Sequence, residues 1–310
     1  SWQEKNTIII LTMLALTVIT LIPNVIFIKH YLAGPVLGSD RVAVINELNK
    51  FAKTDDYVIS WWDYGGALWF YGNVKTIASP NYQDPAALYI LSKLLIAPTP
   101  LETANLMRWS VEKFASGQRY FTGFSWEGRH PDEFLATDKT TAFNLPPKTK
   151  DAYLFLPIDI LSIAYPIASY SNIDLHTGNP LRNINFVSDG NYQQAGTIVK
   201  LAQYAITLDF DKLTAVSGNQ TLPIKAFHIA YYDQTGNLKT KSTATNITAD
   251  LHAVVMPHQH VALIMDDQMF NSSLIQMLVF ENYDHALFEP VALTPGAKIY
   301  RLKKQPHANF

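Results

Sequence analysis

The sequence predicts a mixed α/β (α+β) domain that carries a β-rich subdomain and is preceded by one transmembrane helix. Three observations predict this fold class. Residues 6–28 carry no charge, residues 57–79 read strand, turn, helix and strand, and after about residue 190 the chain breaks into short β-type runs. We expect the chain to have four parts. Residues 1–37 form the transmembrane helix and a linker, and residues 38–189 form the α/β core with the "WWDYG" stretch. Residues 190–258 form the β-rich subdomain, and residues 259–310 return to the α/β core.

Composition excludes several classes of protein. The chain has 310 residues, 48% of them hydrophobic, which is enough for a sizeable core. Its formal net charge of −2 gives no basic surface for nucleic acid. Without any cysteine, the chain has neither a disulfide framework nor a thiolate metal site.

The uncharged stretch 6–28 predicts a membrane span. At 1.5 Å per residue it forms a helix of roughly 34 Å, which crosses a hydrocarbon core of about 30 Å. Charged or titratable residues flank it at 4–5 and 29–30, and Pro23 is tolerated inside a membrane helix. A cleaved signal peptide is the alternative, but the apolar run is long and no small-residue cleavage site follows promptly.

Local patterns predict the elements of the core in order. Asp40 is placed to cap a helix whose apolar residues are Val42, Ile45, Leu48 and Phe51. We then expect a strand at 56–61, a short helix at 65–72, a strand at 74–79, helices at 84–97 and 99–116, a surface excursion at 117–150, and a strand running into a helix at 152–170. A capping box of Thr99 and Glu102 begins the helix at 99–116.

The second half of the chain alternates β-type runs with turn signals. Runs at 197–210, 213–217, 224–233 and 244–256 are separated by "SGNQ" and "QTGN". Residues 260–267, a helix at 268–280 and a strand at 297–304 are expected to rejoin the core. Asn-x-Ser/Thr triplets begin at Asn219, Asn246 and Asn271, and we expect Asn271 to cap a helix start.

Metal-binding patterns are weak. His258 and His260 form a His-x-His pair near His252, and Asp209 and Asp211 share one face of a strand. Neither pair has further ligands at a fixed spacing. The histidine pair is therefore better interpreted as part of a loop, and the aspartate pair as a solvated strand end. No Gly-rich phosphate loop or nucleophile elbow is present.

The stretch "SWWDYG" at 60–65 combines groups that suit a hydroxyl. Trp61 and Trp62 each offer an indole N–H, and Asp63 offers an acceptor. A hydroxyl group can accept a hydrogen bond from an indole N–H and donate one to a carboxylate. A site made of these groups therefore discriminates against ligands that lack the hydroxyl. The alternative interpretation is an aromatic corner in which Asp63 caps a helix.

The longer string "DYVISWWDYGGALWFYGNVKTIAS" resembles the signature of the catalytic subunit of oligosaccharyltransferase, bacterial single-subunit PglB type. "ANLMRWSVEKF", "IKAFHIAYYD" and "MFNSSLIQMLVFENYDHALFEPV", closing on "AKIYRLKK", extend the resemblance over nearly the whole chain. It implies a last transmembrane helix followed by an extracytoplasmic domain with a barrel-like subdomain.

The resemblance implies roles for named residues. Trp61, Trp62 and Asp63, supported by Tyr64 and Gly65, would hold the Ser or Thr two residues after the acceptor Asn. A second family motif, Met-x-x-Ile-x-x-x-Val on a helix, corresponds to Ile160, Ile163 and Ile167, with Ile in place of Met and of Val. Ile163 would contact the threonine methyl.

The implied activity is transfer of an oligosaccharide from a polyprenyl pyrophosphate to Asn in Asn-x-Ser/Thr sequences. The partners implied are the acceptor polypeptide, the lipid-linked oligosaccharide and the membrane, with the soluble domain on the periplasmic side of the inner membrane. In that family, carboxylates in membrane loops activate the acceptor and bind a divalent cation, Mg²⁺ or Mn²⁺, and these loops lie outside this chain. We therefore expect no catalytic residue and no metal ligand here. We also expect no activity from the chain alone. The alternative is a non-catalytic, membrane-anchored module that binds peptide or glycan.

Overall fold

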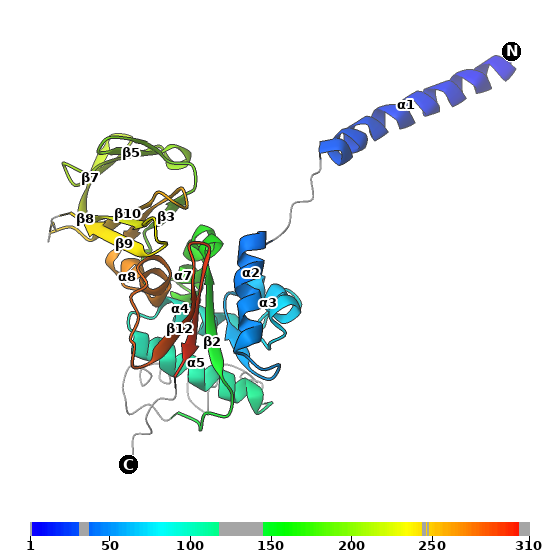
Figure 1. Ribbon diagram of the computed structural model, residues 1–310. Helices are drawn as coiled ribbons and strands as arrows, with labels where there is room; N and C mark the ends of the chain where they lie inside the picture. Colours follow the sequence, from blue (N-terminus) through cyan, green and yellow to red (C-terminus); the bar gives the residue numbers. More distant parts are fainter. Residues whose placement is uncertain (1, 31–36, 118–144, 244–245, 247, 304–310) are drawn as a thin grey trace. The chain divides into compact units, whose positions relative to one another are not determined.

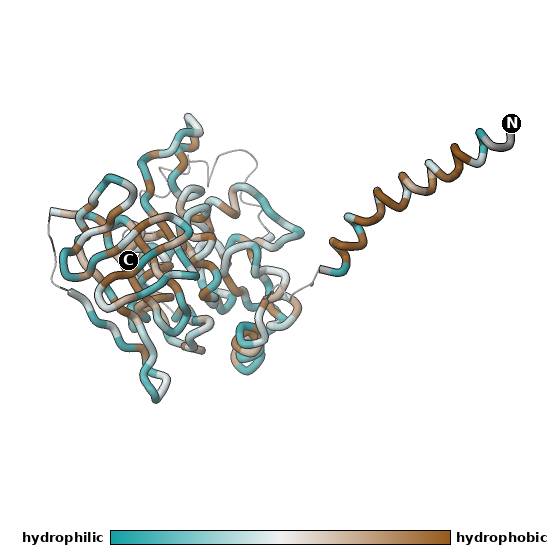
Figure 2. The backbone as a smooth tube through the Cα atoms, turned by 90° about the horizontal axis from the view of Figure 1, so that it is seen from above, coloured by the Kyte–Doolittle hydropathy of each residue, from teal (hydrophilic) through white to brown (hydrophobic). Residues whose placement is uncertain are grey.

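The computed structural model describes residues 2–30, 37–117, 145–243, 246 and 248–303, in two compact units, Ser1–Gly38 and Ser39–Phe310 (Figure 1). The first unit consists of helix α1 (Trp2–His30), with Pro23 inside it. Its segment Lys5–Lys29 has a hydropathy of 2.4 and is not buried, and it is apolar along its length (Figure 2). By length and composition this helix is able to cross a membrane.

The second unit is built on two sheets. The four-stranded sheet has the order β1 (Tyr57–Ile59), β2 (Ala152–Pro157), β13 (Ala297–Leu302), β12 (Phe288–Leu293). Strands β1 and β2 are parallel, with Tyr57 opposite Ala152 and Ile59 opposite Leu154, whereas the other pairs are antiparallel. Every residue of β2 is buried, so both faces of this sheet are covered.

Helices supply this cover. Helices α5 and α9 pack against β2 and β13, whereas α2 packs against β12 and β13 and also contacts α3. The α-helices of the unit are α2 (Ser39–Glu47), α3 (Gly65–Gly72), α4 (Pro85–Ile96), α5 (Pro100–Ala115), α7 (Ala164–Ser171), α8 (Asp267–Phe270) and α9 (Ser273–Val279). The described residues also form four 3₁₀ turns: η1 (Leu48–Lys50), η2 (Trp62–Tyr64) and η3 (Ile158–Ile163), which lie between helices and strands, and η4 (Ala202–Tyr204), which lies between β5 and β6.

The second sheet has nine strands and curls into a half-barrel (Figure 1). Its order is β3 (Phe186–Asp189), β11 (Val261–Asp266), β10 (Leu251–Met256), β8 (Gln220–Tyr232), β7 (Thr214–Ser217), β6 (Ile206–Asp209), β5 (Ile198–Leu201), β4 (Gln193–Ala195), and β9 (Leu238–Ser242) also pairs with β8. Its core includes Phe227, which is 1% exposed and packs on Phe210 with ring centroids 4.2 Å apart. The mixed α/β class and the β-rich subdomain are thereby confirmed.

The half-barrel includes strands on both sides of the predicted β-rich segment. Strands β3 and β11 lie outside residues 190–258, yet both belong to the nine-stranded sheet. The four-part division of the chain stays a prediction.

Several local predictions hold. Thr99 accepts a hydrogen bond from the Glu102 backbone N–H at 3.2 Å and begins α5, and Asp84 caps α4 in the same way through Ala86 at 2.9 Å. The strand at 57–59 and the helix at 65–72 form as expected. Most of the surface excursion, residues 118–144, lies outside the described residues.

Other local predictions are wrong, each for a physical reason. Asp40 lies in the first turn of α2 instead of capping it, because the helix begins at Ser39 and the carboxylate pairs with Arg41. Phe51 is 52% exposed because α2 gives way to the 3₁₀ turn η1, whose different period rotates it from the core. The expected strand at 74–79 is reduced to single bridges, such as Lys75 with Tyr57. Asn271 ends α8, and Ser272 caps α9.

Gly65, the first residue of α3, lets the backbone of residues 78–79 pass very close to it. A Cβ at this position would lie 2.1 Å from the backbone oxygen of Ala78 and 2.7 Å from the Cα of Ser79. Both atoms belong to the backbone and cannot yield as a flexible side chain would. At the next position the space is open, since a Cβ on Gly66 meets its nearest atom, in Pro80, at 3.8 Å.

Gly65→Ala is therefore expected to destabilise the domain by about 3 kcal/mol or to prevent its folding, because the backbone must move. The matched variant Gly66→Ala should be neutral or stabilising by up to about 1 kcal/mol, since it adds helix propensity without a clash. Urea unfolding of the full chain in detergent measures both. Equal stabilities of the two variants would contradict the role assigned to Gly65.

A chain of hydrogen bonds, buried at its two central histidines, ties the half-barrel to α8. Ser242 Oγ lies 2.8 Å from His228 Nδ1, His228 Nε2 lies 3.1 Å from His252 Nδ1, and His252 Nε2 lies 2.6 Å from Asp267 Oδ1. Because the pKa values of both histidines are lowered, both rings are taken as neutral; His252 then donates to the Asp267 carboxylate, His228 donates to His252, and Ser242 donates to His228. The ring of Phe270 stacks on both imidazoles.

Acid should weaken this junction. Burial, and then the neighbouring His252, lower the pKa of His228 from 6.5 to about 4, and burial lowers the pKa of His252 despite its bond to Asp267. A depressed pKa means that stability is complete above pH 6.5 and is lost as the pH falls toward 4, by up to about 3 kcal/mol for His228.

Unfolding of the full chain at several pH values between 7 and 4 measures this loss. His228→Gln should reduce the dependence of the unfolding free energy on pH in this window, whereas the exposed His176→Gln should leave it unchanged. Identical pH profiles for the wild type and His228→Gln would contradict the assignment.

Candidate functional site

The candidate site lies where two adjacent parallel strands end. Strand β1 ends at Ile59 and leads into η2 with Trp62, Asp63 and Tyr64, and β2 ends at Pro157 and leads into η3. Because β1 and β2 pair in parallel, both turns leave the same edge of the sheet. The rings of Tyr64 and Phe155, 6.1 Å apart and edge to face, connect the two segments.

The two tryptophans differ in burial. The side chain of Trp61 is 3% exposed and meets the ring of Tyr170, on α7, edge to face at 5.8 Å, whereas Trp62 is half-buried. Within the described residues, neither indole N–H donates to a protein acceptor, and neither nitrogen is sealed from solvent. Trp62 is the more exposed of the two indoles.

Asp63 projects from η2 as an exposed carboxylate. It makes no capping bond, since neither η2 nor α3 is capped by a side chain. The alternative interpretation of a helix-capping Asp63 is therefore wrong. Partial burial raises the pKa of Asp63 above its ordinary value, and the hydrogen bond from its own backbone N–H opposes this shift. Burial, with the negative charges of Asp159 and Asp63, also raises the pKa of Tyr64.

The three isoleucines of the second motif have different surroundings. Ile160 and Ile167 are fully buried and hold η3 and α7 to the core, whereas Ile163 is half-buried at the end of η3. Of the three, Ile163 has apolar surface left for a ligand. The motif is divided between a 3₁₀ turn and a helix, because Ile160 and Ile163 lie in η3 and only Ile167 lies in α7.

The candidate metal residues are engaged in local structure. His252 belongs to the buried chain of hydrogen bonds, and Asp209 and Asp211 accept bonds within the turn and from Thr197. Among the residues that the structure describes, no three His, Cys, Asp or Glu side chains gather as metal ligands would.

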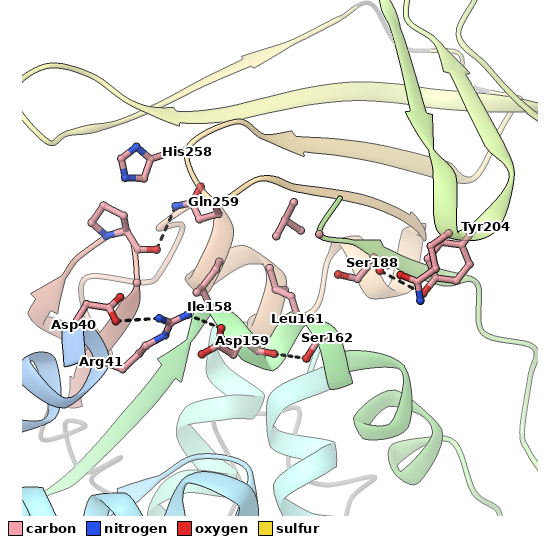
Figure 3. A pocket seen from close by; sticks show the side chains of 15 residues that line it. Asp40, Arg41, Ile158, Asp159, Leu161, Ser162, Ser188, Tyr204, His258 and Gln259 are labelled. Carbon is pink, nitrogen blue, oxygen red and sulfur yellow. Dashed lines mark hydrogen bonds and ion pairs between the residues drawn. The ribbon is translucent and has the colours of Figure 1, made fainter. Parts of the chain in front are cut away.

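Sequence reasoning missed a cavity of about 510 Å³ between η3 and the half-barrel (Figure 3). It is lined by groups from α2, η3, η4 and three turns or strand ends, among them Arg41, Asp159, Tyr204 and Gln259. None of Trp61, Trp62, Asp63 or Ile163 lines it. No local pattern could have found it, because its wall is assembled from segments up to about 250 residues apart.

Comparisons with known proteins agree with this architecture. Residues 54–177, which include both candidate motifs, match the STT3/PglB/AglB core domain. Undecaprenyl-diphosphooligosaccharide–protein glycotransferases of two strains of Campylobacter jejuni, RM1221 and serotype O:2 ATCC 700819, are each 27% identical over 311 residues, 93% of this chain and 42% of theirs. The crystal structure of the C. jejuni PglB C-terminal domain superimposes with a TM-score of 0.69 at 24% identity, covering 84% of this chain and 99% of that one.

The fold is that of the C. jejuni PglB C-terminal domain, and residues 54–177 match the core domain of the STT3/PglB/AglB proteins. This chain carries the STT3/PglB/AglB core domain and is a distant homologue of the bacterial PglB proteins. It spans 42% of the length of the curated relatives that it matches.

The contact of Tyr170 with Trp61 can be tested. Tyr170→Ala should cost about 1 kcal/mol of stability and shift the indole N–H resonance of Trp61, because the edge-to-face partner is lost. Tyr170→Phe keeps the ring and should leave both nearly unchanged. NMR of the indole N–H region with urea unfolding measures the two effects; an unmoved Trp61 resonance in Tyr170→Ala would contradict the contact.

Proposed function

We propose that this chain is the acceptor-recognition part of an oligosaccharyltransferase, one that transfers a polyprenyl-pyrophosphate-linked oligosaccharide to Asn in Asn-x-Ser/Thr sequences. One observation carries the proposal. The half-buried Trp62 and the exposed Asp63 of the "WWDYG" motif lie at the same sheet edge as the half-buried Ile163, inside the segment that matches the family model. The similar C. jejuni proteins are undecaprenyl-diphosphooligosaccharide–protein glycotransferases, which suggests the reaction class.

In this proposal the hydroxyl of the acceptor Ser or Thr accepts from an indole N–H of Trp61 or Trp62 and donates to Asp63. A peptide with Ala at that position excludes water from the indole N–H and the Asp63 carboxylate but gives them no hydrogen-bond partner. Such a peptide therefore binds more weakly. Ile163 contacts the threonine methyl, and one methyl is worth about 1 kcal/mol, so Thr is favoured over Ser.

Catalysis needs more than this chain contributes. We propose that Mg²⁺ or Mn²⁺ and the carboxylates that activate the acceptor amide belong to the membrane loops of the complete enzyme, that helix α1 anchors the domain in the inner membrane, and that the domain faces the periplasm. The chain alone is then inactive. A non-catalytic module that binds peptide or glycan is the second candidate, and it predicts binding without transfer in any context.

Peptide binding to the full chain in detergent tests the acceptor site. An Asn-x-Thr peptide should shift the indole resonances of Trp61 and Trp62 and the methyl resonances of Ile163, whereas an Asn-x-Ala peptide should not. Asp63→Ala should weaken Thr-peptide binding about tenfold to a hundredfold, as expected for a bond to a charged group. Ile163→Ala should reduce the preference for Thr over Ser by about fivefold.

Trp69 supplies the matched control, because it is a 68% exposed indole on α3, outside the site. Its resonance, and binding by Trp69→Ala, should not change. Equal responses to the Thr and Ala peptides would reject the acceptor site.

A chimera separates the two candidate functions. Replacing the matching part of the C. jejuni glycotransferase with this chain should give transfer to Asn-x-Thr peptides in the presence of Mn²⁺, whereas this chain alone should give none. Asp63→Ala in the chimera should lower transfer at subsaturating peptide by a factor similar to its loss of binding. A folded chimera that binds peptide and transfers nothing would favour the non-catalytic module.

A further inference from the structure

Helix α3 presents large aromatic side chains to solvent. Trp69 is 68% exposed and Phe70 is 71% exposed, and Tyr71 follows at 39%. Leu68 and Gly72 are buried, and the helix packs on α2, beside which it lies in Figure 1. The helix therefore has one side in the core and an aromatic face, made of residues 69–71, that is open to solvent.

The aromatic face is large enough to be a contact surface. The rings of Phe70 and Tyr71 meet edge to face with centroids 4.9 Å apart, and Trp69 precedes them directly. Aromatic side chains have areas on the order of 150–250 Å² each, so the three together expose about 300–400 Å². A patch of this size is comparable with the largest on a typical soluble monomer, which is often functional.

The segment after α2 adjoins the end of this helix. Asn49 donates from Nδ2 to the carbonyl oxygen of Tyr71 at 3.0 Å, and Asn73 donates from Nδ2 to Thr54 Oγ1 at 3.3 Å. Between these two anchor points lies Phe51, whose side chain is 52% exposed. A fourth exposed aromatic ring therefore belongs to the segment that borders the aromatic face.

Covalent linkage keeps a membrane within reach of the aromatic face. Helix α1, which is able to cross a membrane, ends at His30, and α2 begins at Ser39. The eight residues between them span at most about 28 Å. Helix α2, on which α3 packs, is itself only nine residues long. If α1 is anchored in a bilayer, the domain cannot diffuse away from its surface, so even a weak contact is populated.

The composition and size of the face favour lipid over a protein partner. None of the eight residues of α3 is charged, and Trp and Tyr are enriched where a bilayer meets water. Lys53, on the neighbouring segment, is exposed and makes no ion pair with the described residues, which suits anionic headgroups. A stable protein interface buries about 800 Å² on each partner, roughly twice what this face exposes.

We propose that the aromatic face of α3 is a membrane-interface contact. Trp69 and Phe70 enter the boundary between the headgroups and the acyl chains of the bilayer that holds α1, and Tyr71 lies at the level of the headgroups. The inference rests on the proposed anchoring by α1. It adds to the proposed function that the "WWDYG" turn, directly before α3, is held near the surface in which a lipid-linked donor resides.

Fluorine NMR of the full chain in bilayer nanodiscs tests the proposal. The chain carries 5-fluorotryptophan, the nanodiscs contain phosphatidylethanolamine and phosphatidylglycerol, and Trp69→Phe assigns the resonance of Trp69. A nitroxide on the lipid acyl chains should broaden this resonance, whereas a water-soluble gadolinium chelate should not. Trp109, which is 2% exposed on α5, is the internal control and should respond to neither probe.

Phe70→Ser should lower the ratio of membrane-bound to free domain about tenfold, because it removes much of the apolar contact. At Trp69 the nitroxide broadening should fall and gadolinium broadening should appear. Leu222→Ser is the matched control, since Leu222 is 42% exposed on β8 of the half-barrel, and it should behave as the wild type does. Both side chains are exposed, so the urea midpoint of either variant should equal that of the wild type.

Broadening of Trp69 by gadolinium and not by the nitroxide would overturn the proposal, because the face would then lie in water. Absence of a response to both probes would also overturn it, since a protein surface such as a second copy of the chain would cover the face. Elution of the chain apart from the nanodiscs would reject this contact together with the proposed anchor. A chain that elutes with the nanodiscs while Trp69 responds only to gadolinium keeps the anchor and loses the contact. Peptide titration in detergent, which presents no bilayer, tests the acceptor site independently.

Discussion

Parallel pairing of β1 with β2 is the constraint on which the candidate site depends. The two strands are separated by more than ninety residues, yet their register places η2 and η3 at one edge of the sheet. The sheet can hold this arrangement because β2 is buried on both faces. Gly65, which follows η2, lets the backbone carbonyl of Ala78 lie against the start of α3, where a Cβ would clash with it.

Two sets of hydrogen bonds, each running through a buried side chain, tie the half-barrel to the core. The hydrogen bonds from Ser242 to Asp267 link β9, β8 and β10 to α8. In the second set, Lys298 of β13 is 1% exposed and donates to Tyr232 of β8 and to Glu281. Burial lowers the pKa of Lys298, while its bond to Glu281 opposes that shift. Such networks have directional requirements, so they fix the position of one sheet against the other more specifically than apolar packing does.

The 3₁₀ turn η3 connects the proposed acceptor site with the cavity. Ile163, at its end, is half-buried and is the residue that we propose for the acceptor contact, and Asp159, in its first turn, lines the cavity. Its remaining members, including Ile160, anchor it in the core. A rigid turn on a buried strand is suited to holding the acceptor contact and the cavity wall at a fixed separation, because neither side can move without the other.

Some features of this protein follow from the sequence alone. The uncharged run at 6–28, the Thr99 cap and the "WWDYG" string are local patterns, and they were sufficient to predict helix α1, the start of α5 and the resemblance to the family. Alternating β-type runs after residue 190 were sufficient to predict the β-rich subdomain, because burial on one face leaves a period of two.

Tertiary structure decided what depends on partners distant in the sequence. Residues 74–79 have strand composition, but Lys75 finds only one backbone bridge, so no strand forms. His252 sits in a predicted β-type run, but only the pairing of β8 with β10 brings His228 to it and makes it part of a buried relay. The cavity is the extreme case, since Arg41 and Gln259 are 218 residues apart. Local propensity is a property of a few neighbouring residues, whereas a shared wall, a relay or a sheet register exists only after the chain has closed on itself.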